Sequence, residues 1–433
     1  MKRTVLQRVA AATLVAAVGL GGFVLAAAPV KVSVWSWRAQ DAPLWQNVQK
    51  ALNASGSNVQ IDFRSIVPTN YDSVLQTAFD NGNGPDLFYG RAGEGTFRYA
   101  AANFISPVDS FLSFDNFVPA SLAAVHWQGK NWGVPLDDEV MAVFYNKATF
   151  AKYDLTPPQT WSQFMELNKT LKSKGVTPIY VMPIQTWMIA LDIESVGATE
   201  LGNSGAQAIV SKQANYDSPA YKHVLSLFTS LIPYFESNYM AVGSDVNAQE
   251  VAFATGQAAM TIDGGFDVPT MVKFGLPRSS IGVFLVPPDQ AGKKAQAEWY
   301  PDADLAMNAG IKDASVKQAA QAIMKYATST AFGQSFADIA GEISPVKGVQ
   351  ITAKYSVAQQ LYKWFQQVPI NPLVGIRSPM DTPPPTPVTQ KSVNSDVGIF
   401  TAEGNVSQAL LSKKVTPDQA AAQIQKAVSW YFQ

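Results

Sequence analysis

Strand-like and helix-like segments alternate along residues 30–90, and this alternation constrains the fold more than any other feature of the chain. Val30, Val32 and Val34 recur at every second position, which is the period of a β-strand with one buried face. Three strand-like and two helix-like runs follow one another in the order 30–37, 43–52, 58–67, 71–82 and 85–90. A β-α-β-α-β order predicts a parallel, doubly wound sheet flanked by helices, and hence an α/β fold.

A second region of the same kind follows. Further strand-like runs occupy 140–146, 258–265 and 281–288, and helical runs include 315–328 and 355–365. Two helix starts carry their own signals. Thr160 with Gln163 predicts a capping box before a helix that ends at Gly175, and Thr416 with Pro417 predicts the start of the last long helix. The Pro-rich stretch 380–388 predicts an extended loop.

The length of 433 residues exceeds what one hydrophobic core usually supports, so we expect two domains. In open α/β sheets, ligands bind beyond the carboxyl ends of the strands. We therefore expect a ligand cleft between the two domains.

Composition excludes several classes of protein. The net charge of −1 offers no electrostatic footprint for nucleic acid, so we expect no nucleic-acid partner. The chain has no cysteine, and its two histidines, His126 and His223, have no ligand-like spacing, so we expect no metal site. No G-x-S-x-G turn, Walker A loop or G-x-G-x-x-G motif occurs, so we expect no cofactor and no catalytic residue.

The N-terminus has the three parts of a secretory signal. Basic residues 2, 3 and 8 precede an apolar run from Val9 to Leu25, and small residues at 26–28 supply a cleavage site. We expect residues 1–28 to be a cleavable signal peptide and the mature protein to be periplasmic or otherwise extracytoplasmic. No cysteine follows, so lipoprotein anchoring is not expected. An uncleaved membrane anchor is the alternative.

Two tryptophans stand where the first strand ends. Trp35 and Trp37 lie on the face opposite the three valines, and Arg38 and Asp41 follow them. Sugar rings present apolar C–H faces for aromatic stacking and a rim of hydroxyls for planar polar groups. The pattern predicts that this strand end forms one wall of a sugar site, with Trp37 as the preferred stacking residue. Trp187 and Trp299 also stand beside polar residues at the ends of elements.

Carboxylates gather in three places, namely Asp137 to Glu139, Asp192 with Glu194, and Asp302 with Asp304. A glycosidase needs two carboxyl groups across the scissile bond, and the sequence does not exclude such a pair among these residues. Carboxylates equally accept hydrogen bonds from sugar hydroxyls in a binding site.

Five motifs in the same order resemble the family 1 extracellular solute-binding proteins, the sugar-binding receptors of ABC importers. The longest is "GKNWGVPLDDEVMAVFYNKATF" (129–150), with Pro157-Pro158 before Thr160-Trp161. The others are "NGNGPDLFYG" (81–90), "FATGQAAMTIDGGF" (253–266) and the late helical region 315–348. The similarity runs from about residue 30 to the end of the chain.

The resemblance implies a two-lobed periplasmic-binding-protein fold of type II, in which each lobe is a doubly wound mixed sheet and a multi-strand hinge joins them. The lobes would comprise 29–138 plus 289–342, and 139–288 plus 343–433. The chain would cross between lobes near 138–141, 283–288 and 343–346. The implied partners are a carbohydrate ligand and the membrane permease subunits of an ABC transporter, and we expect a monomer.

The resemblance also suggests site residues. Glu139 matches a glutamate that binds sugar hydroxyls, Phe266 stands where relatives often carry tryptophan, and Trp187 matches a variable aromatic position. Trp299, Tyr300 and Asp302 replace a Gly-Gly turn that faces the cleft in many relatives. The full expected ligand site comprises Trp35, Trp37, Arg38, Asp41, Arg91, Glu139, Trp187, Asp263, Gly265, Phe266, Asp267, Trp299, Tyr300 and Asp302.

Two alternatives remain beside a sugar receptor. The same fold could bind a non-sugar solute such as a polyamine, a phosphoester or a peptide, and an anionic solute would require Arg38 and Arg91 to converge. An exported glycoside-active enzyme is the third hypothesis.

Overall fold

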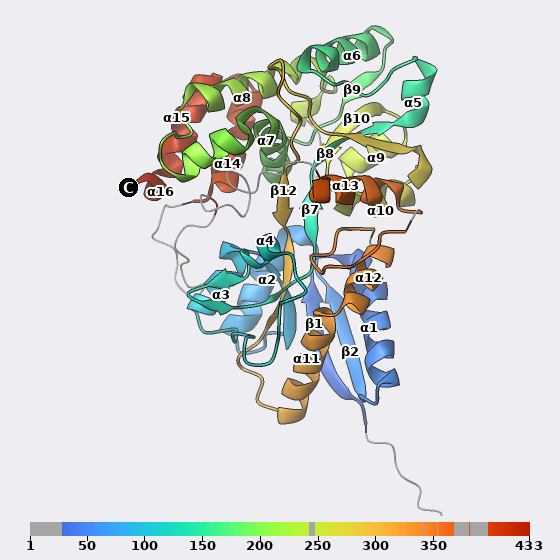
Figure 1. Cartoon of the computed structure of the whole chain (residues 1–433), viewed down its shortest axis with the longest axis vertical. Helices are drawn as coiled ribbons and strands as arrows, with labels where there is room; N and C mark the ends of the chain where they lie inside the picture. The colour runs from blue at the N-terminus through green and yellow to red at the C-terminus, as the bar shows by residue number, and fades with distance from the viewer. Residues whose placement is uncertain (1–27, 242–246, 340, 353, 368–380, 382–396) are drawn as a thin grey trace, which may run out of the picture.

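Two β-sheets, each covered by helices, form the two halves of the molecule (Figure 1). The computed structural model describes residues 28–241, 247–339, 341–352, 354–367, 381 and 397–433. The predicted signal peptide, except residue 28, and all of the Pro-rich stretch except residue 381 lie outside this part of the chain. We call the half with the five-stranded sheet the first lobe and the half with the four-stranded sheet the second lobe.

The first-lobe sheet has the order β2-β1-β3-β13-β6. Strand β1 (Val30–Ser36) pairs in parallel with β2 (Val59–Ser65) and β3 (Leu87–Arg91), as the alternation predicts. Strand β13 (Ala303–Met307) joins from far along the chain and pairs antiparallel with β3 and with β6 (Val134–Pro135). The sheet is therefore mixed.

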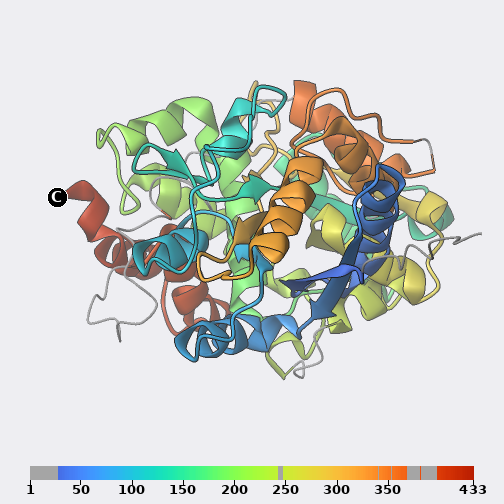
Figure 2. The same cartoon turned by 90° about the horizontal axis from the view of Figure 1, so that it is seen from below.

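Helices cover both faces of this sheet, because the two sides of β1 are buried against different partners. Val32 and Val34 are fully buried with residues of α1 (Ala42–Ala54), α11 (Ala314–Ala327) and α12 (Thr330–Ile339). The opposite face packs on α2 (Pro68–Asp80) and α3 (Glu94–Ala101). Figure 2 shows α1 and α2, both blue, on opposite sides of the blue strands.

The second-lobe sheet has the order β11-β8-β10-β9. Its strands are β8 (Ala142–Asn146), β9 (Thr177–Ile179), β10 (Ala258–Asp263) and β11 (Ile281–Phe284). Beside this sheet lies a group of mutually packed helices, on the left of the upper half in Figure 1: α7 (Thr186–Val210), α8 (Pro219–Ser230), α14 (Ile399–Leu411) and α15 (Pro417–Ala427).

The lobes are joined by a short two-stranded ribbon between the two sheets. Strand β7 (Asp138–Val140) pairs antiparallel with β12 (Trp299–Pro301), and Asp138 also forms a backbone bridge with Ile343. Strands β7 and β12 therefore pass between the lobes side by side, with Ile343 beside β7 (Figure 1). The chain does not cross a third time near 343–346, where the resemblance suggests a crossing, because Val346, Val349 and Ile351 still pack in the first-lobe core.

The second crossing differs from its expected place at 283–288. Strand β11 belongs to the second-lobe sheet, and the segment after it still contacts that lobe, because Asp289 N–H donates to Glu200 Oε1 at 2.8 Å and Lys293 pairs with Glu200. The strand that passes between lobes is β12. The run 140–146 is also divided, at Met141, into β7 and β8.

Helix starts follow the cap signals closely. Thr160 accepts a hydrogen bond from Gln163 N–H at 3.2 Å before α6 (Trp161–Ser173), but the Gln163 side chain accepts from Gln159 N–H, so the expected reciprocal box is incomplete. Thr416 and Gln419 form a complete capping box at α15. The remaining described helices and strands are α4 (Pro119–Leu122), β4 (His126–Trp127), β5 (Lys130–Asn131), α5 (Lys147–Lys152), α9 (Ala248–Ala254), α10 (Val268–Lys273), α13 (Ser356–Gln367) and α16 (Ser429–Phe432).

Candidate ligand site at the lobe junction

A buried arginine lies among carboxylates where the lobes meet. Arg38, directly after β1, is 3% exposed. Its Nε donates to Asp41 Oδ2 at 3.1 Å, and its terminal nitrogens pair with Asp137 at 3.0 Å, Asp302 at 3.6 Å and Glu342. We call these residues, together with Glu139, the lobe-junction cluster. Among the described residues, every ion pair of Asp41, Asp137, Asp302 and Glu342 goes to Arg38.

Backbone and phenol donors hold two of these carboxylates in place. Asp41 Oδ2 also accepts from Tyr89 Oη at 2.8 Å, and Tyr89 in turn accepts from the buried Trp45 indole at 3.1 Å. Asp137 Oδ1 accepts from Ala303 N–H at 2.8 Å. Arg38 and Asp41, expected at the rim of a sugar site, therefore lie inside a preorganised network.

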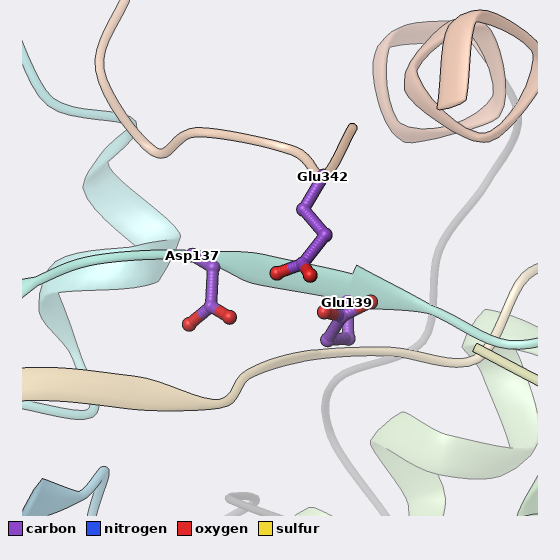
Figure 3. Close-up of side chains that lie close together, drawn as sticks. All are labelled: Asp137, Glu139 and Glu342. Carbon is purple, nitrogen blue, oxygen red and sulfur yellow. The ribbon is translucent and has the colours of Figure 1, made fainter. Parts of the chain in front are cut away.

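Glu139 is the carboxylate of the cluster that forms no ion pair among the described residues, and buried oxygens of Asp41, Asp137 and Glu342 also lack a hydrogen-bond partner. Glu139 is 1% exposed, and its Oε1 has no hydrogen-bond partner among the described residues. Burial and the nearby Glu342 and Asp137 raise the pKa of the Glu139 carboxyl well above its ordinary value. Carboxylate oxygens of these three residues lie within 4.8 Å of one another. Figure 3 shows Glu342 reaching from its own segment toward the strand that carries Glu139.

The second lobe contributes an acidic turn next to Glu139. A Cβ on Gly265 would lie 3.4 Å from Glu139 Oε2, so the 3-10 turn Gly265–Asp267 is close to that carboxyl. Oxygens of Asp263, Asp267 and Glu250 also lie within 4.8 Å of one another. Burial and the neighbouring acids raise the pKa values of Asp263 and Asp267. Gly265 beside Glu139 and the charge of Glu342 felt at Asp267 place this second acidic group close to the lobe-junction cluster.

Either acidic group has the oxygen donors that hard cations prefer. At the lobe junction, a cation would compete with Arg38, since its guanidinium already pairs with Asp137 and Glu342. The geometry of that group therefore favours a hydrogen-bonding solute over a closed metal cage.

An exposed aromatic pair lies on the second lobe. The Trp187 side chain is 41% exposed and its ring centroid is 6.4 Å from that of Phe266, which is adjacent to Gly265. Trp187 Nε1 donates to Gln185 at 2.8 Å, which fixes the orientation of the indole. The fold thus brings Trp187 and Phe266, which lie in separate segments of the sequence, into contact.

The first-lobe tryptophans are partly buried and carry arginines on their rings. The Arg91 guanidinium lies 4.4 Å from the Trp37 ring centroid, and that of Arg64 lies 4.6 Å from the Trp35 ring centroid. Arg91 also pairs with Asp72 at 3.0 Å. A sugar stacking on the covered face would have to displace a guanidinium. Arg91 and Arg38 do not converge as an anionic ligand would require.

Trp35 faces a different part of the surface. It lines a depression of about 520 Å³, open to solvent, whose other walls come from α2 and the residues after it. This places Trp35 apart from the lobe-junction cluster.

Trp299 and Tyr300 are buried in the hinge ribbon, 1% and 3% exposed. Trp299 packs in an apolar cluster with its ring centroid 5.4 Å from that of Phe365, and Tyr300 packs in the second-lobe core. Their burial does not favour direct ligand contact. Asp302, one residue beyond the ribbon, joins the lobe-junction cluster instead.

Sequence reasoning missed two members of the cluster, Asp137 and Glu342. Asp137 had a signal, because it lies two residues before Glu139 and so shares its face of an extended segment. Glu342 had none, because only the fold brings it to Arg38.

Comparisons with known proteins agree with this architecture. A model of the bacterial extracellular solute-binding protein family matches residues 35–334, well over half of the chain. The chain belongs to this family. Among the described residues, no helix has the length and apolar run needed to cross a bilayer.

Curated relatives include a multiple sugar-binding protein of Streptococcus mutans, 26% identical over 251 residues, covering 55% of this chain and 59% of the relative. A maltotriose-binding protein of Pyrococcus abyssi is 23% identical over 263 residues, covering 60% of this chain and 54% of the relative. The chain therefore spans between half and two thirds of the length of these relatives.

Solved structures share the fold over nearly the whole chain. A chitin oligosaccharide binding protein has a TM-score of 0.75 and 17% identity, covering 93% of this chain and 99% of the other. The maltose/maltodextrin-binding domain MalE from Bdellovibrio bacteriovorus, bound to maltotriose, has a TM-score of 0.66 and 20% identity, covering 93% and 99%. The fold is the two-lobed fold of these proteins.

Proposed function

We propose that the protein is an extracytoplasmic receptor that binds a mono- or oligosaccharide between its lobes and delivers it to the permease of an ABC transporter. The observation that carries the proposal is the unpaired, buried Oε1 of Glu139 where the lobes meet, beside the turn Gly265–Asp267 of the second lobe. The similar proteins described above, which are a multiple sugar-binding, a maltotriose-binding and a chitin oligosaccharide binding protein, support the same class of ligand. No chemical step is required of the protein.

The polar contacts would come from both lobes. Glu139 would accept hydrogen bonds from sugar hydroxyls through its carboxyl oxygens. Asp267 would offer further polar atoms from the second lobe. Trp187 and Phe266 would supply the apolar platform on which a ring can stack. Ligand contacts to both lobes would shift the population toward a closed form.

A cationic solute is the second candidate, and one observation favours it. The lobe-junction cluster contains five carboxyl groups and one arginine. A polyamine or an amino sugar would supply positive charge that this group lacks. An anionic solute is disfavoured, because Arg38 is engaged by four carboxylates.

Isothermal calorimetry with the purified chain tests these candidates. The titrants would be a panel of mono- and oligosaccharides, with spermidine as the cationic probe and inorganic phosphate as the anionic one. Binding of a neutral saccharide supports the sugar receptor, and binding of spermidine alone would replace it by the second candidate. Chromatography of the saccharides after incubation would reveal turnover, which would revive the enzyme hypothesis.

One substitution tests the aromatic platform. Trp187→Ala should weaken saccharide binding by about 1 kcal/mol through lost stacking. Phe274→Ala is the matched control, since Phe274 is also an exposed second-lobe aromatic, 37% exposed. Equal effects of the two substitutions would remove Trp187 from the site.

A further inference from the structure

Three segments that meet at the lobe junction each carry a carboxylate there, two of them at the first-lobe ends of the crossing strands β7 and β12. Asp137 directly precedes β7, and Asp302 directly follows β12. Glu342 directly precedes Ile343, whose backbone bridges Asp138. The sheets bring these three residues together from distant parts of the sequence.

One guanidinium contacts all three carboxylates. Arg38 pairs with Asp137 at 3.0 Å, with Asp302 at 3.6 Å and with Glu342, while its Nε is held by Asp41. The Arg38 side chain is 2% exposed, so these contacts are shielded from water. A planar guanidinium has five N–H donors in a fixed fork, whereas an ammonium is a single point charge.

We propose that Arg38 is a positioning residue for lobe closure, which fastens the first-lobe ends of β7 and β12, and the Glu342 segment that pairs with β7, to the end of β1. The lobes then move about a fixed axis in the ribbon beyond these contacts. The part of this inference that concerns ligand-driven closure rests on the proposed function.

The same contacts explain why Glu139 is available to a ligand. Arg38 engages Asp137 and Glu342, whose oxygens lie within 4.8 Å of a Glu139 oxygen, but it forms no ion pair with Glu139 among the described residues. Arg38 therefore orders Asp137 and Glu342, the two neighbours of Glu139 drawn in Figure 3, while Glu139 Oε1 has no hydrogen-bond partner among the described residues. A ligand at Glu139 would contact the arrangement that holds the hinge.

Hydrogen exchange of the ligand-free protein, followed by mass spectrometry, tests the positioning role. Three amides report on the junction: Asp138 donates to Ile343 O, Met141 to Glu298 O, and Asp302 to Asp137 O. Arg38→Met should raise exchange in peptides covering 138–141 and 299–302 together, by about tenfold or more, because local opening becomes easier. Arg64→Met is the matched control, since Arg64 is also a first-lobe arginine but lies exposed over the Trp35 ring.

A milder variant keeps the test decisive if Arg38→Met does not fold. Asp302→Asn removes one partner whose side chain is 17% exposed, and should raise exchange at 299–302, though by less than Arg38→Met does. Exchange that is unchanged at 299–302 in this variant would overturn the proposal. So would an increase confined to one segment in Arg38→Met.

Closure is measured separately, by small-angle scattering with a saccharide that binds the wild type. Arg38→Lys should still bind the saccharide but show a smaller decrease in radius of gyration than wild type, because one ammonium cannot hold three segments. An unaltered decrease would overturn the role of Arg38 in closure. A wild-type chain that binds no saccharide would remove the proposed function, while the exchange experiment still decides whether Arg38 fastens the hinge.

Discussion

The Glu139 carboxyl group combines deep burial with an unused hydrogen-bonding atom. Burial and the adjacent Glu342 and Asp137 raise its pKa well above the ordinary value. Glu139→Ala should weaken saccharide binding by about 2 kcal/mol, roughly 30-fold, because a buried sugar hydroxyl loses its partner. Calorimetry measures the change, with Glu166→Ala as a control, since the Glu166 side chain is 68% exposed on α6. Unchanged affinity would exclude Glu139 from the site.

A second buried acid makes stability depend on pH. Burial raises the pKa of Asp138 from 3.8 to about 8, although a hydrogen bond from Ser121 opposes the shift. The folded state thus holds this proton more tightly than the unfolded chain. The stabilisation is complete below the unfolded pKa near 3.8, and it is lost as pH rises toward about 8.

Asp138→Asn removes this titration, because an amide stays neutral throughout. We expect the thermal midpoint of the variant to fall less than that of wild type between about pH 5 and pH 8. Scanning calorimetry at several pH values measures the slope. Asp62→Asn is the control, because the Asp62 side chain is 62% exposed. Parallel slopes for wild type and Asp138→Asn would contradict the assignment.

Among the elements, α15 offers a clean test of local stability. Thr416 caps its N-terminus and forms a capping box with Gln419. Thr416→Ala should reduce the free energy of unfolding by about 1 kcal/mol, because helix N–H groups lose their acceptor. Urea denaturation measures this difference, and Lys414→Ala, an exposed position just before the cap, should have almost no effect. A capping contribution is ruled out if the two variants unfold alike.

Local patterns predicted most elements but could not choose between similar apolar strands. The first three strands and both helices between them follow directly from period and cap signals. The second crossing between the lobes was expected near 283–288, whereas the strand that crosses, β12, lies at Trp299–Pro301. Both segments are apolar, and periodicity does not say which one pairs with β7. That choice depends on the register Val140–Trp299, a contact between distant residues.

The candidate site was predictable in composition but not in arrangement. Sequence brought forward Arg38 from its position after the first strand, and the family resemblance brought forward Glu139. Neither could show that Arg38 would be buried against Glu342, because that contact exists only after the end of β1 and the segment 341–343 meet. Trp299 has polar neighbours in the sequence, as a cleft residue would, but strand pairing buries its side chain in an apolar cluster. Solvent exposure is set by tertiary packing rather than by neighbours in sequence.

At the scale of the whole molecule, ligand binding should both compact and stabilise the protein. A saccharide at 100 times its dissociation constant should add about 2.7 kcal/mol to the free energy of unfolding, since it binds only the folded state. The radius of gyration in small-angle scattering should fall at the same concentrations. A thermal-shift series run beside the scattering checks that the two responses share one midpoint. Stabilisation without compaction would argue against closure.

The position of β13 has a consequence for how the chain folds. This strand lies between β3 and β6, yet it follows every strand of the second-lobe sheet in the sequence. During synthesis, one edge of β3 stays unpaired until residues 303–307 emerge, and such long-range pairing is slow. A fragment that ends before residue 303 would therefore expose a ready template for aggregation. The first lobe begins the chain, but it is completed only after the second-lobe sheet has been made.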